Sequence, residues 1–446
     1  MTRQATGKAF AVLFRDFQRW SVNSFFTIRW NWPASTIKPL SHALERKTIA
    51  VDRKRGIPSG LVLASLHFDG EMEPRDSDVA AFKGKLFLAE PGDVLYSKID
   101  VRNGAIGVVP PSMPRVAVSS EYPVYGIRPN VALPQYVRLL FRTSAFRRQI
   151  NSLISGASGR KRVQPSHLER IEVPLPDPSL QRVIVDCWHE AQRSVDTARD
   201  RVSEPVQLLN GRLIEIYRRM CARDVIHSRY FVVEFKDLAA WDAKSGRAAS
   251  FRIACPSFRP MGDFIEETTE LVRPTAEPNK EWPVYGVNNK DGVFLNSYQK
   301  GSTFNAPYKR IRKDWFFHNP TRSNVGSLGI VPDVPEDAIT SPEYQVWRMK
   351  RDAPEPLLPG YIACLIQTPF FLDLVQFNRV GAVKQRMYTE NLMQLRVPYL
   401  PVADQQRYAD AREKALAELA AAKRRLDDAL KEVEAMILGI KKVSAS

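Results

Sequence analysis

Two long stretches of the chain carry apolar residues at alternating spacings of four and three positions. In the C-terminal stretch they are Ala415, Leu419, Ala422, Leu426, Ala429, Val433, Met436 and Ile440. In the central stretch they are Ile184, Trp188, Ala191, Val195, Ala198 and Val202, followed by Leu209, Leu213, Ile216 and Met220. This spacing aligns apolar side chains along one side of a helix and is typical of coiled coils. We therefore predict long helices over 179–224 and 403–446.

The two predicted helices have the same period, so we expect them to pair with each other as an antiparallel coiled coil. The alternative is that each helix packs only on its own domain. Pro205 occupies an apolar position of the first helix. Proline lacks an N–H group and crowds the preceding turn, so we expect a kink or a restart there, with Ser203 as its cap.

The segments before the helices, 1–178 and 225–402, contain short β-type runs that alternate with Gly and Pro turns. This pattern predicts two mixed α/β domains. Short sequence matches recur between them in the same order, 221 to 225 residues apart. They include Gly92–Tyr96 with Lys313–Phe317, Gly107–Pro110 with Gly329–Pro332, and Gln181-Arg182 with Gln406-Arg407. We interpret the chain as a tandem duplication, with an α+β fold in which each domain precedes a long helix.

The 446 residues carry a net charge of +16, and the excess is concentrated in the predicted domains. Residues 1–178 have a net charge of +11 and residues 225–402 of +3, whereas each helical segment has +1. A basic surface favours a polyanionic partner such as nucleic acid. No apolar run approaches the length of a membrane span. The four cysteines are isolated, so we expect no zinc site and no disulfide framework, and a cytoplasmic location.

A Gly/Ser loop, 155–159, is followed directly by Arg160, Lys161 and Arg162. The matching loop of the second copy contains Gly381 and is followed by Lys384 and Arg386. Glycine allows backbone N–H groups to approach an anion, and the cations neutralise it, so both loops are candidate phosphate contacts. The alternative is a solvated basic turn. Sequence motifs of phosphate-loop, serine-hydrolase and zinc-protease sites are absent, which favours a protein that binds without catalysing.

Several short sequence segments, and the order in which they occur, resemble the pattern of the specificity subunit of type I restriction-modification systems. They are Glu90–Leu95, Gly104–Val109, Ser155–Val163 before Val173–Pro176, Gly326–Val331 and the Gly381 loop. The resemblance implies two target-recognition domains that read the halves of a bipartite site in double-stranded DNA. It implies that spacer helices set the gap and dock two methyltransferase subunits, with restriction subunits completing the complex. S-adenosylmethionine, ATP and Mg would then be held by these partners and no cofactor by this chain, and no membrane is involved.

Candidate base-reading residues lie on loops after matching strands: Lys98, Arg102 and Asn103 in the first domain, and His318, Arg322 and Asn324 in the second. Arginine and asparagine suit two-point contacts with guanine and adenine. The alternative is that these residues cap turns. Two other functions stay open: a stand-alone DNA-binding regulator or adaptor of another defence complex, and a nuclease or methyltransferase with an unrecognised site.

Overall fold

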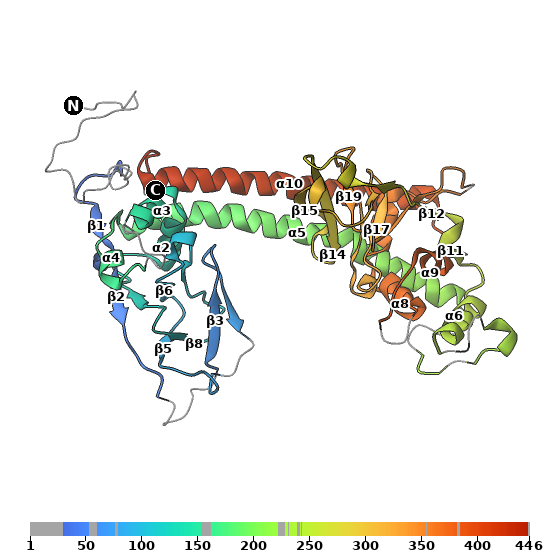
Figure 1. Ribbon diagram of the computed structural model, residues 1–446, viewed down its shortest axis with the longest axis horizontal. Coiled ribbons are helices and arrows are strands. Elements are labelled where there is room, and N and C mark those ends of the chain that lie inside the picture. The colour runs from blue at the N-terminus through green and yellow to red at the C-terminus, as the bar shows by residue number, and fades with distance from the viewer. Residues whose placement is uncertain are drawn as a thin grey trace. The chain divides into compact units, whose positions relative to one another are not determined.

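The computed structural model describes residues 30–52, 60–75, 79–152, 162–221, 228–230, 232–238, 241, 243–353, 355–380 and 384–444. The chain forms two compact units. Unit 1 comprises residues 1–195 and 422–446, and unit 2 comprises residues 196–421. Both boundaries fall inside long helices, α5 (Pro178–Met220) and α10 (Val402–Leu438), which are labelled in Figure 1. Each unit therefore contains the first part of one helix and the last part of the other.

Unit 1 is built on two four-stranded sheets. The first is antiparallel and has the order β2 (Leu44–Lys47), β9 (Val124–Ile127), β6 (Val94–Tyr96), β7 (Ile106–Val108). The second has the order β4 (Met72–Arg75), β3 (Val62–Leu66), β8 (Val116–Ser119), β5 (Leu86–Ala89), with β3 and β8 parallel. The remaining elements are β1 (Ile37–Pro39), which pairs with β10 (Glu172–Pro174), and helices α2 (Pro134–Arg142), α3 (Ser144–Ser152) and α4 (Pro165–Glu169).

Unit 2 repeats this plan. Its four-stranded sheet has the order β12 (Ile265–Glu267), β20 (Gln345–Met349), β17 (Phe316–His318), β18 (Leu328–Ile330). Its second sheet has the order β13 (Leu271–Val272), β16 (Tyr308–Arg310), β19 (Ile339–Thr340), β14 (Glu281–Asn288), β15 (Gly292–Lys300), with β14 and β19 parallel. The remaining elements are β11 (Arg259–Pro260), which pairs with β21 (Arg396–Val397), and helices α6 (Ala243–Ala254), α7 (Pro359–Leu365), α8 (Pro369–Asn378) and α9 (Thr389–Gln394).

The strand registers confirm the duplication. Val94 pairs with Val108 in unit 1, and Phe316 pairs with Ile330 in unit 2, a constant separation of 222 residues. Each parallel strand pair, β3 with β8 and β14 with β19, has its equivalent in the other unit. The predicted α+β fold, with two similar mixed domains that each precede a long helix, is therefore confirmed.

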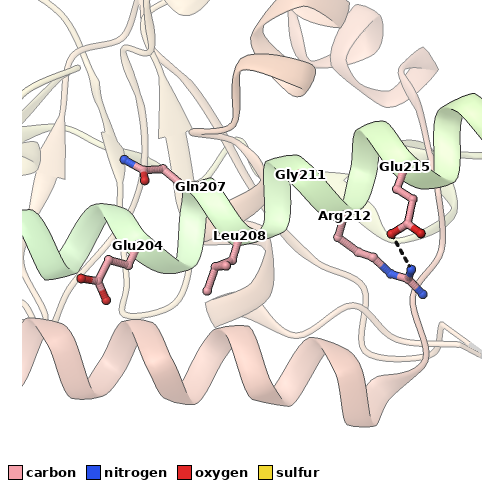
Figure 2. Close-up of a pocket in the computed structure, with 6 residues that line it drawn as sticks. All are labelled: Glu204, Gln207, Leu208, Gly211, Arg212 and Glu215. Atoms are coloured by element: carbon pink, nitrogen blue, oxygen red, sulfur yellow. Dashed lines mark hydrogen bonds and ion pairs between the residues drawn. The ribbon is translucent and has the colours of Figure 1, made fainter.

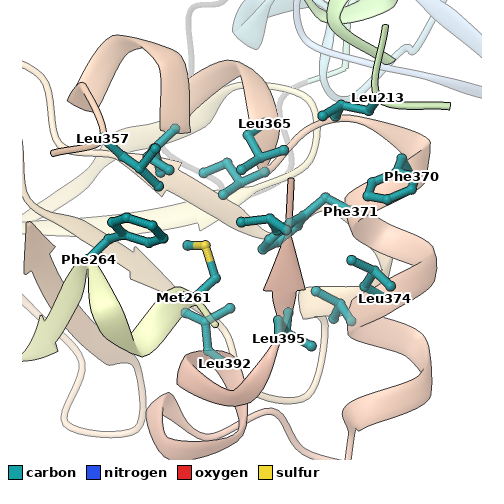
Figure 3. Close-up of a cluster of buried hydrophobic side chains, with 14 of the residues drawn as sticks. Leu213, Met261, Phe264, Leu357, Leu365, Phe370, Phe371, Leu374, Leu392 and Leu395 are labelled. Atoms are coloured by element: carbon teal, nitrogen blue, oxygen red, sulfur yellow. The ribbon is translucent and has the colours of Figure 1, made fainter. Parts of the chain in front are cut away.

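Each hydrophobic core includes residues of both long helices. In unit 1, Ile184 and Val185 of α5 pack in one cluster with Val433, Met436 and Ile437 of α10. In unit 2, the buried residues Leu209, Leu213 and Tyr217 of α5 pack against α8, and Figure 3 shows Leu213 near Phe370. Tyr408 of α10 packs against the same cluster. These contacts remove apolar surface of the helices and the sheets from water, and this burial stabilises both.

The pairing of the helices is antiparallel. In unit 1 the start of α5 lies against the end of α10, as the shared core shows. In unit 2 a later part of α5 meets an earlier part of α10, where Arg201 and Glu418 form an ion pair of 2.9 Å. This confirms the predicted antiparallel arrangement of the seams.

The prediction of a helix restart at Pro205 is wrong, whereas the predicted kink stays a prediction. Helix α5 runs without interruption through this proline, whose side chain is buried on the seam. Ser203 does not cap a new helix, because its hydroxyl donates to the Asp200 carbonyl at 2.7 Å. Buried residues on both sides of the proline, Ala198 and Leu209, hold the helix in place. Their packing offsets the single hydrogen bond that proline cannot make.

A buried glutamine joins the start of each long helix to the preceding domain. The Gln181 side chain accepts from the Leu133 N–H at 2.8 Å and donates to the Val131 and Pro176 carbonyls at 2.8 and 2.7 Å. Gln405 repeats the pattern, accepting from the Leu358 N–H at 2.8 Å and donating to two carbonyls, those of Pro356 and Leu400. Both glutamines are fully buried.

The equivalent of Gln181 is therefore Gln405, and its alignment with Gln406 was wrong by one residue. Gln406 is exposed and donates to Asp410 on its own helix. Two adjacent glutamines look alike in the sequence, and they are distinguished only because Gln405 faces the core and Gln406 faces solvent.

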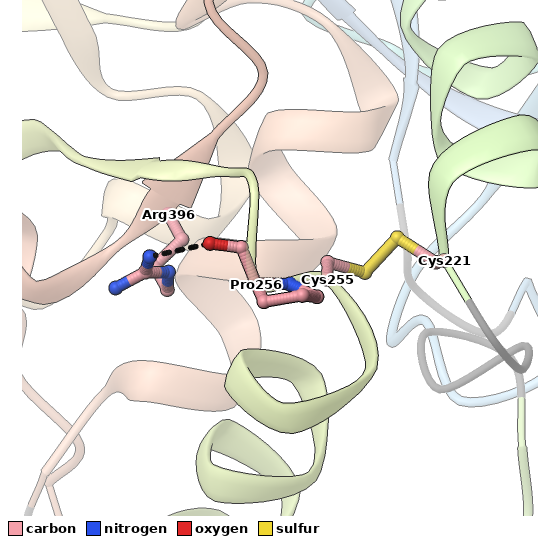
Figure 4. Close-up of a disulfide and its surroundings, with 4 residues drawn as sticks. All are labelled: Cys221, Cys255, Pro256 and Arg396. Atoms are coloured by element: carbon pink, nitrogen blue, oxygen red, sulfur yellow. Dashed lines mark hydrogen bonds between the residues drawn. A yellow bond between two sulfur atoms is a disulfide. The ribbon is translucent and has the colours of Figure 1, made fainter.

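The isolated cysteines predict no disulfide framework, yet the structure contains a disulfide between Cys221 and Cys255, with their Cα atoms 4.6 Å apart (Figure 4). The bond joins the residue after α5 to the residue after α6. Cys187 and Cys364 are free.

Among the described residues, no single helix is long and apolar enough to cross a membrane. The bent pair of α7 and α8 meets the length and composition of a span when taken together, and both helices contribute to the core of unit 2.

The glutamine joint gives a direct test of stability. Replacing Gln405 by leucine leaves the buried Leu358 N–H and Leu400 carbonyl without partners. Each such group costs about 1–3 kcal/mol, so we expect the thermal midpoint of the unit to fall by about 4 °C or more. The matched control is Gln406→Leu on the exposed side of α10, which should leave the midpoint unchanged. Equal midpoints for the two variants, measured by calorimetry, would show that the buried glutamine is not a structural joint.

Candidate nucleic-acid interface

A loop with the same backbone conformation follows an inner strand of the antiparallel four-stranded sheet in each unit, β6 in unit 1 and β17 in unit 2. Loop A, residues 97–105, connects β6 to β7, and loop B, residues 319–327, connects β17 to β18. Each contains a 3₁₀ turn that ends at a glycine with positive φ, 105° at Gly104 and 87° at Gly326. Side chains rarely allow this conformation, so glycine is required there. The hydrogen bonds that close the two turns also match. The Gly104 N–H donates to the Val101 carbonyl at 3.0 Å, and the Gly326 N–H donates to the Ser323 carbonyl at 3.1 Å.

Loop A brings together the three base-reading candidates of unit 1. Arg102 and Asn103 are exposed at its tip. Within the described part of the chain, the Arg102 side chain has no hydrogen bond or ion pair, whereas the Asn103 amide donates to Asp100 at 3.4 Å. Lys98 is partly exposed and donates to the Ser120 carbonyl at 2.6 Å. These contacts leave Arg102 as the most available of the three.

On loop B, Arg322 is exposed and also without a side-chain partner among the described residues. Asn324 is partly exposed and stands at the position equivalent to Arg102. Both loops thus present a polar side chain from the equivalent position of the turn, Arg102 on loop A and Asn324 on loop B. Base contact by Lys98, Arg102, Asn103, Arg322 and Asn324 stays a prediction.

The structure corrects the assignment of His318 as a base-reading residue. His318 is fully buried. Its Nδ1 accepts a hydrogen bond from the Trp347 indole at 3.2 Å, so the ring proton lies on Nε2 and is shared with the Met387 carbonyl at 2.8 Å. Burial lowers the histidine pKa to about 4, which keeps the ring neutral. His318 therefore holds the site together from within and cannot reach DNA in this conformation.

Two hydrogen bonds hold the ends of the basic segment of unit 2, which runs from Arg379 to Met387, beside loop B. The Met387 N–H donates to the Pro320 carbonyl at 2.9 Å, and Arg379 donates to the Thr321 carbonyl at 3.1 Å. Between these anchors, Lys384 and Arg386 are exposed. Lys384 has no side-chain partner within the described residues, and Arg386 donates to the Tyr388 hydroxyl at 3.4 Å. The candidate phosphate contacts and the candidate base readers of unit 2 are thus neighbours.

Unit 1 has hydrogen bonds at the equivalent positions, although the residue types differ. Tyr96, equivalent to His318, donates its hydroxyl to the Val163 carbonyl at 3.2 Å, and the Val163 N–H donates to the Lys98 carbonyl at 2.9 Å. Arg162, directly before this anchor, is half exposed and pairs with Glu121 at 3.5 Å. Arg160 and Lys161 lie outside the described residues.

Arg142 was missed by the sequence reasoning, although it shapes loop A. Its guanidinium donates to three backbone carbonyls, those of Phe68, Gly104 and Ile106. Burial lowers its pKa to about 10, so it stays charged at neutral pH. Arg142 lies at the end of α2, where a basic residue carries no distinguishing sequence signal. Arg142 therefore has a structural role, because its guanidinium is bonded to the backbone, whereas the Arg102 side chain is exposed.

The described residues include no cluster of histidine, cysteine and acidic side chains that could hold a metal ion. A surface groove lies on α5 in unit 2 instead, lined by Glu204, Gln207, Leu208, Gly211, Arg212 and Glu215 (Figure 2). Leu208 is 68% exposed there, and an ion pair of 3.0 Å between Arg212 and Glu215 borders it. The groove thus places one exposed apolar side chain among charged and polar side chains of α5.

Three solved structures are similar to this chain over most of its length. One comes from work on complex assembly and conformational transition of the type I R-M system; it shares 13% identity over 91% of this chain and 95% of that chain, with a TM-score of 0.39. The HsdS subunit from Thermoanaerobacter tengcongensis shares 13% identity over 91% and 94%, with a TM-score of 0.30. The S subunit of a type I restriction-modification system from M. genitalium shares 10% identity over 90% and 94%, with a TM-score of 0.38. No family model and no curated protein matches the sequence.

Proposed function

We propose that the chain is a DNA-binding specificity subunit of a type I restriction-modification complex. The observation that carries the proposal is the repetition of one loop architecture in two units. Loops A and B have the same turn, the same positive-φ glycine and the same anchor to the segment that follows the basic loop. Two readers on one scaffold suit a DNA site with two halves, because each reader can then present different side chains.

The charge distribution supports DNA as the partner. The net excess lies in the segments that form the sheets, +11 in residues 1–178 and +3 in residues 225–402. Exposed cations next to exposed polar readers provide the two kinds of contact that DNA recognition combines. Cations on the phosphates give affinity and position, whereas arginine and asparagine on base edges give selectivity. No catalytic group is needed for this function, and we propose that the chain itself catalyses nothing.

We further propose that α5 and α10 set the gap between the two half-sites and dock two methyltransferase subunits. The groove around Leu208 is the candidate contact on α5, since it combines an exposed apolar side chain with flanking charges. In this proposal the methyltransferase subunits bind S-adenosylmethionine, and restriction subunits supply ATP- and Mg-dependent steps. The competing function, a stand-alone regulator or an adaptor of another defence complex, predicts DNA binding without such partners.

Phosphate contact by the basic segment of unit 2 can be tested through salt dependence. We expect the double variant Lys384→Ala/Arg386→Ala to weaken binding to any duplex and to lower the slope of log affinity against log salt by about 2. The measurement is a titration of a mixed-sequence duplex with the full-length chain at several salt concentrations. The control, Lys423→Ala/Arg424→Ala on the exposed side of α10, removes the same charge and should leave the slope unchanged. An unaltered slope for the first variant would refute the phosphate contact.

Docking through the α5 groove predicts that Leu208→Arg prevents a methyltransferase subunit from co-purifying with this chain. A charge placed in an apolar contact is costly when it becomes buried without a partner. The matched control is Leu271→Arg, a leucine on β13 of the same unit that is also exposed, which should leave the complex intact. Equal recovery of the methyltransferase with both variants would exclude the groove as its docking surface.

A further inference from the structure

Each unit has a β-hairpin that turns through an Asp-Gly pair. The β3–β4 hairpin turns at Asp69-Gly70, and the β14–β15 hairpin turns at Asp291-Gly292. The two glycines have positive φ angles of 80° and 66° and lie 222 residues apart, the separation that relates loops A and B. The hairpin tips are therefore equivalent parts of the duplicated unit. Asp-Gly is a strong turn signal between strands.

Both tips are seated directly on the base-reading loop or on the strand that follows it. In unit 1, a Cβ atom added to Gly104 would lie 2.0 Å from the Phe68 carbonyl oxygen, and one added to Gly107 would lie 2.1 Å from that of Gly70. In unit 2, a Cβ atom on Gly329 would lie 2.9 Å from Val293, the second residue of β15. In unit 1 these separations from backbone atoms leave no room for a side chain, so glycine is required there for the tip to approach. In unit 2 the nearest neighbour of a Cβ atom on Gly329 is the Val293 side chain, so the approach is close but less restrictive.

The tip of unit 1 is also fixed by hydrogen bonds. Arg142 donates to the Phe68 carbonyl at 3.2 Å and to the Gly104 carbonyl at 3.1 Å, which links the hairpin to loop A. In unit 2 the Asn288 side chain accepts from the Lys290 and Asp291 N–H groups at 2.8 and 2.6 Å and holds the turn. The backbone on which each tip residue stands is therefore preorganised.

The residue before the aspartate differs between the units although its surroundings are equivalent. In unit 1 it is Phe68, which is 58% exposed. In unit 2 it is Lys290, which is exposed and has no side-chain partner among the described residues. An exposed aromatic ring on a rigid turn contributes nothing to the core. It can, however, contact apolar groups on a bound molecule, and the ammonium group can contact acceptors.

We propose that the Asp-Gly tip of each unit is a second DNA-reading element, with Phe68 and Lys290 as its specificity-determining residues. This inference rests on the proposed function. The ring of Phe68 suits apolar contact with a thymine methyl group, and the ammonium of Lys290 suits the O6 and N7 acceptors of guanine in the major groove. Each unit then reads its half-site with a loop and a hairpin tip side by side, and one tip residue changes what is read.

The test is a binding selection with the full-length chain on double-stranded DNA whose central segment is randomised. The wild type should enrich a sequence with two defined parts. Phe68→Ala should lower the preference for a thymine-containing base pair in one part by about tenfold and leave the other part unchanged. Lys290→Ala should do the same for a guanine in the other part. In Phe68→Lys, the preference at the affected position should move toward guanine.

The controls are Ile49→Ala in unit 1 and Lys300→Ala at the far end of β15, both exposed, which should select the wild-type sequence. Unfolding midpoints equal to the wild type would establish that Phe68→Ala and Lys290→Ala are folded. If both variants select the wild-type sequence, or if they weaken binding equally for all sequences, the tips do not read bases. A wild-type chain that enriches no sequence at all would instead overturn the proposed function on which the tips depend.

Discussion

The packing of each long helix into both cores is the constraint on which the rest of the structure depends. The core of unit 1 requires the last turns of α10, with Val433 and Ile437, and the core of unit 2 requires the last turns of α5, with Leu209 and Leu213. Each copy of the sequence repeat ends after a long helix, whereas the boundaries between the compact units lie inside α5 and α10. Neither half of the sequence therefore contains a complete core, and the two copies fold as parts of one chain.

In the duplicated scaffold, the residues that maintain its shape are buried, and exposed turn residues differ between the two units. Tyr96 and His318 have unlike side chains, yet each bonds to the carbonyl of the residue that anchors the basic segment. Gln181 and Gln405 keep both the residue type and the contacts. At the exposed turns, by contrast, Arg102 stands where unit 2 has Asn324, and Phe68 stands where it has Lys290. One backbone can thus support two different selectivities, because the side chains that hold it are not those that face solvent.

The features predicted correctly from the sequence were those with a periodic or repeated signal. The apolar spacing located both helices and their antiparallel pairing, and the repeated phrases located two similar domains. Local rules failed where tertiary packing decided the outcome. Pro205 stays inside a helix because neighbouring seam residues are buried, and His318 is buried because the indole of Trp347 and the carbonyl of Met387 satisfy its ring nitrogens. The Cys221–Cys255 bond joins residues whose spacing carries no signal.

The most direct measurement of the central claim is the pattern of methylated bases in the genome of a host that expresses this chain with the proposed methyltransferase partner. A specificity subunit with two readers predicts methylated bases within one two-part asymmetric motif, with a gap of fixed length and no base preference between the parts. The motif should disappear when this chain is omitted. A single uninterrupted motif, or methylation that persists without the chain, would contradict a specificity subunit with two readers.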